Sequence, residues 1–175
     1  MKAKIIPFLV IFMLICLVSC TGQTDQNEPL PPNSHVDAPL SQDGQEYAYF
    51  TVFEDLFEKD PALNHESVYL AVDLTNTQLA NTEPIIALIQ DFCDDNGYTL
   101  LLDTIDGLME KGYIKDLHFE EGFVIAFADI ELDTNRLVTS AMKWRSGLGA
   151  IGADYTVEQN NGTWEITEMS NNWIS

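Results

Sequence analysis

Residues 143–175 constrain the fold of this chain more than any other stretch. Apolar and polar residues alternate up to a glycine-rich bend, alternate again beyond it, and resume after Asn161 and Gly162. Alternation with a period of two predicts strands, and Asn-Gly between two such runs predicts a hairpin turn. Large aromatic side chains dominate core energetics, so we expect this antiparallel unit to carry the core. All three tryptophans of the chain fall here: Trp144, Trp164 and Trp173.

The glycines of the bend match a nucleotide-binding pattern by their letters alone. Gly147, Gly149 and Gly152 read G-x-G-x-x-G. That fingerprint needs a strand before it and a helix after it, but residues 153–158 alternate as a strand does. The glycines therefore predict a bulge or a close approach of another group to the backbone, and no dinucleotide cofactor.

The first 19 residues have the features of an export signal. Lys2 and Lys4 precede an apolar run over residues 5–18, which is too short to span a bilayer. The run ends Leu17-Val18-Ser19-Cys20, which resembles the lipobox of bacterial lipoproteins. The resemblance implies cleavage before Cys20 and acylation of its thiol with diacylglycerol and palmitate-type chains. An ordinary signal peptide or a helix with a chance cysteine are the alternatives.

Lipidation would place the protein in the cell envelope. Two or more acyl chains anchor a protein stably, so Cys20 would hold it on the cell membrane or outer membrane, facing away from the cytoplasm. Residues 20–45 are proline-containing and lack aromatic residues, which predicts a flexible tether of about 25 to 30 Å. Residues 46–175 then form a single domain.

The charge of the chain limits its partners. Eight Lys and Arg residues stand against 28 Asp and Glu residues, for a formal net charge of −20. Such a charge repels phosphate backbones, which excludes nucleic acid as a partner. A cell-surface protein, a cationic peptide, a small ligand or divalent cations remain, beside the simpler reading of a solvated, soluble surface.

Neither metal nor redox chemistry has a convincing motif. Cys16 would leave with the signal and Cys20 would be lipidated, so Cys93 would be the one free cysteine. It lies in an apolar helical pattern and is expected to be a small buried hydrophobe. The three histidines lack metal-ligand spacing. Residues 92–103 imitate a calcium loop, but Phe92 occupies its first ligand position. We expect no metal and no cofactor.

Periodicity and turn residues predict helices first and strands last. Such an order argues for an α+β fold with helices on one face of a curved antiparallel sheet. Asp103 is expected to cap the third helix, and Gly97 to end the second in a left-handed conformation. The expected helices cover residues 46–58, 82–96 and 104–111, and the expected strands cover 67–74, 98–102, 123–132, 137–146, 151–159 and 163–169.

This arrangement resembles the cystatin-like or NTF2-like architecture. The pattern of an Asn-Gly turn, then Thr163-Trp164-Glu165-Ile166, and a closing Trp173-Ile174-Ser175 is similar to small uncharacterised bacterial lipoproteins. That resemblance carries no known activity. In NTF2-like folds the concave sheet face lines a pocket, where a carboxylate in apolar surroundings can act as a base.

Face parity selects candidate residues for such a pocket. Asp129 is the first candidate base and Asp73 the second, although both could simply face water or pair with a cation. The candidate pocket residues are Tyr69, Phe127, Arg145 and Tyr155.

Two functions follow. The first is a lipid-anchored binding or interaction module without catalysis. The alternative is a small NTF2-like enzyme using a pocket carboxylate. A deep apolar pocket containing Asp129 or Asp73 would favour the enzyme. Trp144 and Trp173 fit either the core or a dimer face.

Overall fold

A computed structural model describes residues 44–175. The expected signal peptide, Cys20 and residues 20–43 of the expected tether lie outside the described residues.

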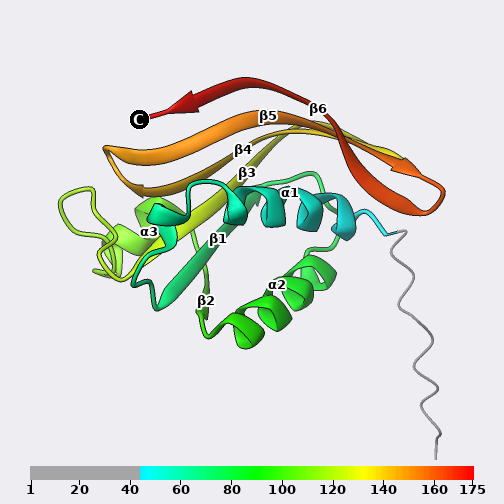
Figure 1. The fold of residues 1–175 in the computed structure, drawn as a ribbon. Helices are drawn as coiled ribbons and strands as arrows, with labels where there is room; N and C mark the ends of the chain where they lie inside the picture. The colour runs from blue at the N-terminus through cyan, green and yellow to red at the C-terminus, as the bar shows by residue number, and fades with distance from the viewer. Residues whose placement is uncertain (1–43) are drawn as a thin grey trace, which may run out of the picture. The chain divides into compact units, whose positions relative to one another are not determined.

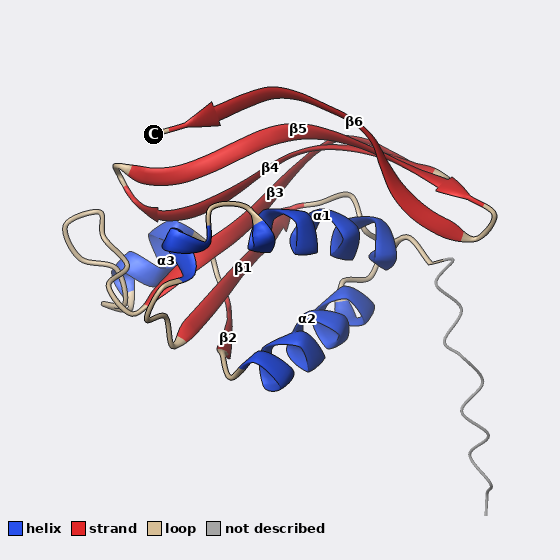
Figure 2. Ribbon diagram, viewed as in Figure 1, coloured by secondary structure: helices blue, strands red, loops and turns tan. Residues whose placement is uncertain are grey.

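Three α-helices, one short 3-10 helix and six strands make up the described domain (Figure 1, Figure 2). Helix α1 has the bounds that its aromatic periodicity predicts, and β6 extends beyond its expected end at residue 169. In chain order the elements are α1 (Glu46–Glu58), η1 (Pro61–Asn64), β1 (Tyr69–Asn76), α2 (Glu83–Asn96), β2 (Thr99–Leu102), α3 (Ile105–Glu110), β3 (Gly122–Asp133), β4 (Arg136–Ser146), β5 (Gly149–Asn160) and β6 (Thr163–Ile174).

The six strands form one mixed, mostly antiparallel sheet in the order β2-β1-β3-β4-β5-β6. Neighbouring strands from β3 to β6 pair antiparallel through short turns. Strand β1 instead pairs parallel with both β2 and β3, so the expectation of a wholly antiparallel sheet is wrong at this edge. The chain reaches β2 and β3 through connections that contain helices, which is how parallel neighbours are joined.

One face of the sheet, called the inner face, shares a buried cluster with α1 and α2. Figure 1 shows α1 lying beneath the arch of β3 to β6. Tyr49 and Phe53 of α1 are fully buried, and the Tyr49 ring meets the Phe127 ring edge-on with centroids 5.6 Å apart. Phe53 meets Phe92 of α2 at 5.0 Å. The fold is therefore α+β, with its largest core between these two helices and the inner face.

The opposite, outer face carries a smaller cluster around α3. Leu108 of α3 is buried with Ala71 and Val124, which alternate with the inner-facing residues of β1 and β3. Helix α3 therefore departs from the expectation that all helices lie on one face. Its N-cap is Thr104, whose Oγ1 accepts from the Gly107 amide at 3.0 Å, and not the expected Asp103.

The tryptophans do not form one core, contrary to the interpretation of residues 143–175. Trp164 is buried in the inner cluster, Trp144 packs on the outer one, and Trp173 is 43% exposed. The aromatic residues of α1 fill the core instead. The turn chemistry of the stretch is confirmed, because Asn161 and Gly162 both have positive φ, at 53° and 83°. Gly97 likewise ends α2 at φ 78°.

Candidate functional site

Side chains of α1 pack on the inner face around Asp129, which limits what the first candidate base can do. Asp129 Oδ2 accepts hydrogen bonds from the Tyr49 hydroxyl and from the Gln78 amide, the latter at 2.7 Å. Asp129 Oδ1 is buried and accepts no hydrogen bond from residues 44–175. Burial, followed by the hydrogen bond to Asp129, raises the pKa of Tyr49 well above its ordinary value. Asp129 is thus enclosed by α1 and the loop after β1.

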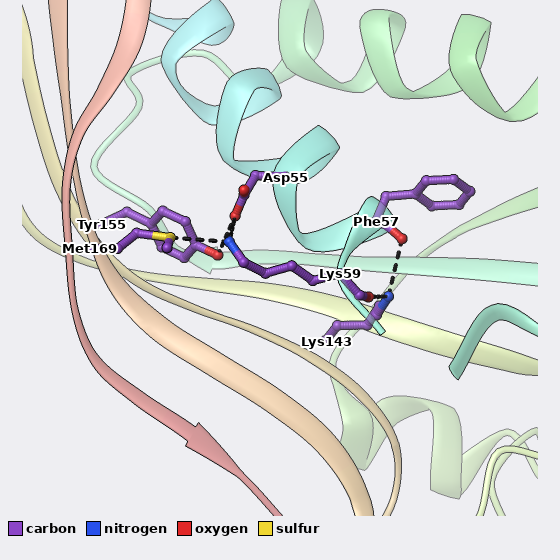
Figure 3. A network of polar contacts seen from close by, with 6 residues as sticks. All are labelled: Asp55, Phe57, Lys59, Lys143, Tyr155 and Met169. Atoms are coloured by element: carbon purple, nitrogen blue, oxygen red, sulfur yellow. Dashed lines mark hydrogen bonds and ion pairs between the residues drawn. The ribbon is translucent and has the colours of Figure 1, made fainter. Parts of the chain in front are cut away.

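Lys143 is the second polar group enclosed on the inner face, and it fixes the end of α1 (Figure 3). Its Nζ donates to the carbonyl oxygens of Phe57 at 3.1 Å and Asp60 at 3.2 Å, and to that of Lys59. It also donates to Asn64 Oδ1 at 3.0 Å. Burial lowers the pKa of Lys143 to about 8, and the nearby Asp60 carboxylate opposes this effect. The ammonium supplies partners for helix-end carbonyls that have none within the helix.

A second network closes the inner face beside Lys143. The Tyr155 hydroxyl donates to Asp55 Oδ2 at 2.7 Å, and Lys59 Nζ pairs with the same carboxylate. Lys59 also lies 3.1 Å from Met169 Sδ of β6 (Figure 3). These contacts tie α1 to β5 and β6. Burial, then the bond to Asp55, raises the pKa of Tyr155 above its ordinary value.

Two of the candidate pocket residues support loops instead. Arg145 donates to the carbonyl oxygens of Leu63 at 3.2 Å, His65 at 2.6 Å and Glu120 at 2.7 Å. Tyr69 stacks on Phe119, with ring centroids 6.2 Å apart, on the outer face. Neither residue contacts Asp129 or Asp73 in the described structure.

The outer face contains an open hollow of about 280 Å³, which we call the outer groove. Strand register builds it from two adjacent rows that run across the sheet. The first row pairs Asp73 with Ala126, Ala126 with Met142, Met142 with Gly152, and Gly152 with Trp173. The second row runs in the same way through Asn76, Ala128, Ser140, Asp154 and Ser170.

Two carboxylates in the outer groove are held in place. Asp154 Oδ1 accepts from the Ser140 hydroxyl, and its Oδ2 accepts from Asn171 Nδ2 at 2.6 Å. These hydrogen bonds, that from Ser140 first, lower the pKa of Asp154. Asp73 Oδ1 accepts from the amide of Thr75 at 2.9 Å and from its hydroxyl at 2.6 Å. Within residues 44–175 neither carboxylate forms an ion pair.

Trp173 forms one wall of the groove because its neighbour is a glycine. A Cβ at position 152 would lie 2.6 Å from the Trp173 indole, so only glycine admits this packing. A bulge in β6 includes Asn171, which has φ 50° and directs its amide to Asp154. The expected close approach at the glycine bend is thus confirmed at Gly152, and β5 follows where a nucleotide fold would need a helix.

Two further cavities adjoin the groove's ends. One, of about 290 Å³, is lined by Tyr155, Lys59, Leu56 and Trp173. The other, of about 330 Å³, lies at Asp73, Thr82 and Asp103. Asp73 lines the outer groove, and Phe127 borders it although its ring lies in the inner cluster. Asp129, Tyr69 and Arg145 line none of these three cavities.

Metal-ligating side chains do not cluster in the described part of the chain. Among residues 44–175 no three His, Cys, Asp or Glu side chains come together. Cys93 is buried, and burial, with a smaller effect of Asp94, raises its pKa to about 11, which disfavours the reactive thiolate. In the same part of the chain, no helix has the length and apolar character that a membrane crossing requires.

Sequence reasoning missed four groove residues: Ser140, Asp154, Asn171 and Trp173. The alternation of residues along β4 and β5 places residues 140 and 154 on one face, so the sequence pattern could have indicated that they lie together. No sequence pattern predicts the bulge that brings Asn171 and Trp173 to this face.

No protein-family model matches the chain, and neither a curated protein nor a solved structure is significantly similar to it.

Proposed function

We propose that this protein is an exported lipoprotein, anchored through acylated Cys20, whose domain binds a positively charged organic ligand in the outer groove. The choice of a cationic ligand rests on one observation: Asp73 and Asp154 line a cavity without any cationic partner among residues 44–175. Opposite charge near a carboxylate stabilises its ionised form, and the net charge of −20 attracts cations from a distance.

An organic ammonium suits the groove better than a metal ion. A metal requires several oxygen ligands around one point, and the described carboxylates do not converge. The exposed indole of Trp173 offers an aromatic surface that attracts ammonium groups. Ser140 donates to the Asp154 carboxylate in the groove. No histidine of the described domain lines the groove to complete a serine-histidine-carboxylate arrangement, so we propose binding without catalysis.

The enzyme alternative called for a deep apolar pocket containing Asp129 or Asp73. Around Asp129, Tyr49, Phe53 and other side chains of α1 pack on the concave face. Asp129 already accepts two hydrogen bonds there. Asp73 lines the outer groove, which is an open hollow on the opposite face.

The proposed anchor rests on the sequence. Lys2 and Lys4, the apolar run and Leu17-Val18-Ser19-Cys20 together have the pattern of a lipoprotein signal. We expect the protein in the membrane fraction, with a mass increase of one diacylglycerol on the peptide that begins at Cys20. The Cys20→Ser variant should lose this modification. An unmodified N-terminal peptide starting elsewhere would contradict the anchor.

We further propose that the domain is a variant of the cystatin-like or NTF2-like architecture. The support is the position of α1 beneath four consecutive antiparallel strands, β3 to β6. At 13 residues, α1 is shorter than the long first helix typical of NTF2-like domains. The parallel edge formed by β1 and β2 departs from that architecture.

Isothermal titration tests the binding proposal. We expect butylamine and choline to bind the full chain, and a neutral disaccharide not to bind. The Asp154→Asn variant should weaken binding of both amines, while Asp95→Asn, the same change of charge on α2, should not. If no ammonium compound binds, or if both variants behave alike, the proposal is wrong.

A further inference from the structure

The two carboxylates of the outer groove lie at its opposite ends. Asp73 belongs to β1 and Asp154 to β5, with β3 and β4 between them. Three steps between neighbouring strands, of about 4.8 Å each, and one step of two residues along a strand separate them by about 15 Å. One ammonium group cannot contact both carboxylates, because a hydrogen bond spans only about 3 Å.

The floor between the two ends carries small side chains and no charged one. Ala126, Ala128 and Ser140 present small side chains there, and Met142 adds a flexible one. Small side chains let an extended aliphatic chain lie across the strands, and the thioether adapts to its shape. The hollow of about 280 Å³ is of the size of a small ligand site and too small for a helix or a strand pair.

Both ends are prepared for a cation before any ligand arrives. Ser140 and Asn171 orient Asp154, and Thr75 orients Asp73. Each carboxylate keeps free lone pairs, since an ionised carboxylate can accept about four hydrogen bonds. Preorganisation of this kind lowers the entropic cost of binding. A second copy of the same acidic chain would bring more negative charge to this face, so it is a poor occupant.

We infer that the ligand is a linear aliphatic molecule with an ammonium group at each end, which spans the outer groove from Asp73 to Asp154 with one end beside Trp173. The inference rests on the proposed function and specifies its ligand. It predicts that affinity depends on the distance between the two charges and not only on their number.

Diamines of equal charge and different length test this inference. Diaminobutane and diaminodecane both carry two ammonium groups, but only the longer one can reach both carboxylates. We expect isothermal titration of the full chain to give an affinity for diaminodecane about ten-fold higher than for diaminobutane. In Asp73→Asn this preference should fall to the affinity ratio of decylamine over butylamine, which reports apolar contact alone, and Asp95→Asn should retain the wild-type preference.

The Gly152→Ala variant provides an independent check of the end near Trp173. A methyl group at position 152 displaces the indole, so diaminodecane binding should weaken while the far-ultraviolet circular dichroism spectrum, which reports secondary structure, stays unchanged. Decylamine, with one ammonium, separates charge spacing from apolar contact and should bind more weakly than diaminodecane.

The outcomes distinguish this inference from the proposed function. Equal affinities for the two diamines, or a preference that is unchanged in Asp73→Asn, would overturn the inference while leaving binding of single cations intact. Absence of binding by every amine, including butylamine, would overturn both.

Discussion

The inner face of the sheet forms the larger core of this protein, whereas the outer face carries an open groove. On the inner face, β3 to β5 contribute buried apolar residues, and the enclosed polar groups Asp129 and Lys143 are bound by neighbouring groups. On the outer face the same strands contribute alanine, serine, methionine and aspartate around an open hollow. Because alternate residues of a strand point to opposite faces, one set of strands supplies both surfaces.

The charged side chains of the domain fall into two groups: those bound by other groups of the protein and those available to a ligand. Lys59, Lys111 and Arg136 pair with carboxylates of the domain, and Lys143 and Arg145 donate to backbone oxygens. The groove carboxylates Asp73 and Asp154 receive hydrogen bonds from neutral groups alone. Mutations on the inner face should therefore change stability, and mutations in the groove should change ligand binding.

Truncating an inner aromatic residue should have the largest effect. Phe53 is fully buried and contacts the Phe50, Phe57 and Phe92 rings. We expect Phe53→Ala to reduce the free energy of unfolding by about 3 to 5 kcal/mol, because it leaves a cavity. Urea denaturation measures the change. A loss below about 1 kcal/mol would mean that α1 does not pack on the inner face as described.

Removing the buried ammonium should come next. Lys143→Met leaves three carbonyl oxygens and Asn64 Oδ1 without this donor, so we expect a loss of about 2 to 4 kcal/mol. The matched control is Lys115→Met, which changes an exposed lysine and should leave the unfolding midpoint in urea unchanged. Equal effects of the two substitutions would contradict a structural role for Lys143.

The same lysine predicts a pH dependence. Its pKa is lowered by burial to about 8, whereas an unfolded lysine titrates near about 10.4. Between these values the unfolded chain holds a proton that the folded protein has lost, so raising the pH favours folding. The stability of the wild type relative to Lys143→Met should increase by on the order of 2 kcal/mol from pH 8 to about 10. Titration of Tyr49 and Tyr155 affects both proteins and therefore cancels in this comparison. A stability difference that does not change with pH would contradict the lowered pKa of Lys143.

Tyr49→Phe tests the enclosure of Asp129 with a smaller effect. It removes one donor and leaves the Gln78 amide as the remaining partner of the carboxylate. We expect a loss of about 1 to 2 kcal/mol by thermal denaturation. In a double-mutant cycle with Asp129→Asn the two changes should be non-additive. Additive changes would show that the hydroxyl and the carboxylate do not interact.

The smallest effect on stability is expected in the groove. Trp173 is 43% exposed, so Trp173→Ala should cost about 1 kcal/mol or less, well below Phe53→Ala. The same change should weaken amine binding by about five-fold, through loss of the aromatic surface. A large loss of stability would mean that the outer face belongs to the core, and the distinction between the faces would fail.

Local features of the chain were predictable because neighbouring residues encode them. The helical spacing of Tyr49, Phe53 and Phe57 specifies α1, and Asn161-Gly162 specifies a turn that needs two positive φ angles. Alternation likewise assigned Asp129 to the face of Phe127. These patterns depend on backbone stereochemistry and on periodicity, which act over a few residues.

Tertiary structure alone decided what depends on distant partners. The parallel pairing of β1, the enclosure of Lys143 by the end of α1, and the bulge that brings Trp173 onto Gly152 each join segments far apart in the chain. Their free energy comes from packing and desolvation in three dimensions, which periodicity does not record. For the same reason the sequence placed Asp73 and Asp129 in one candidate pocket, although they lie on opposite faces of the sheet.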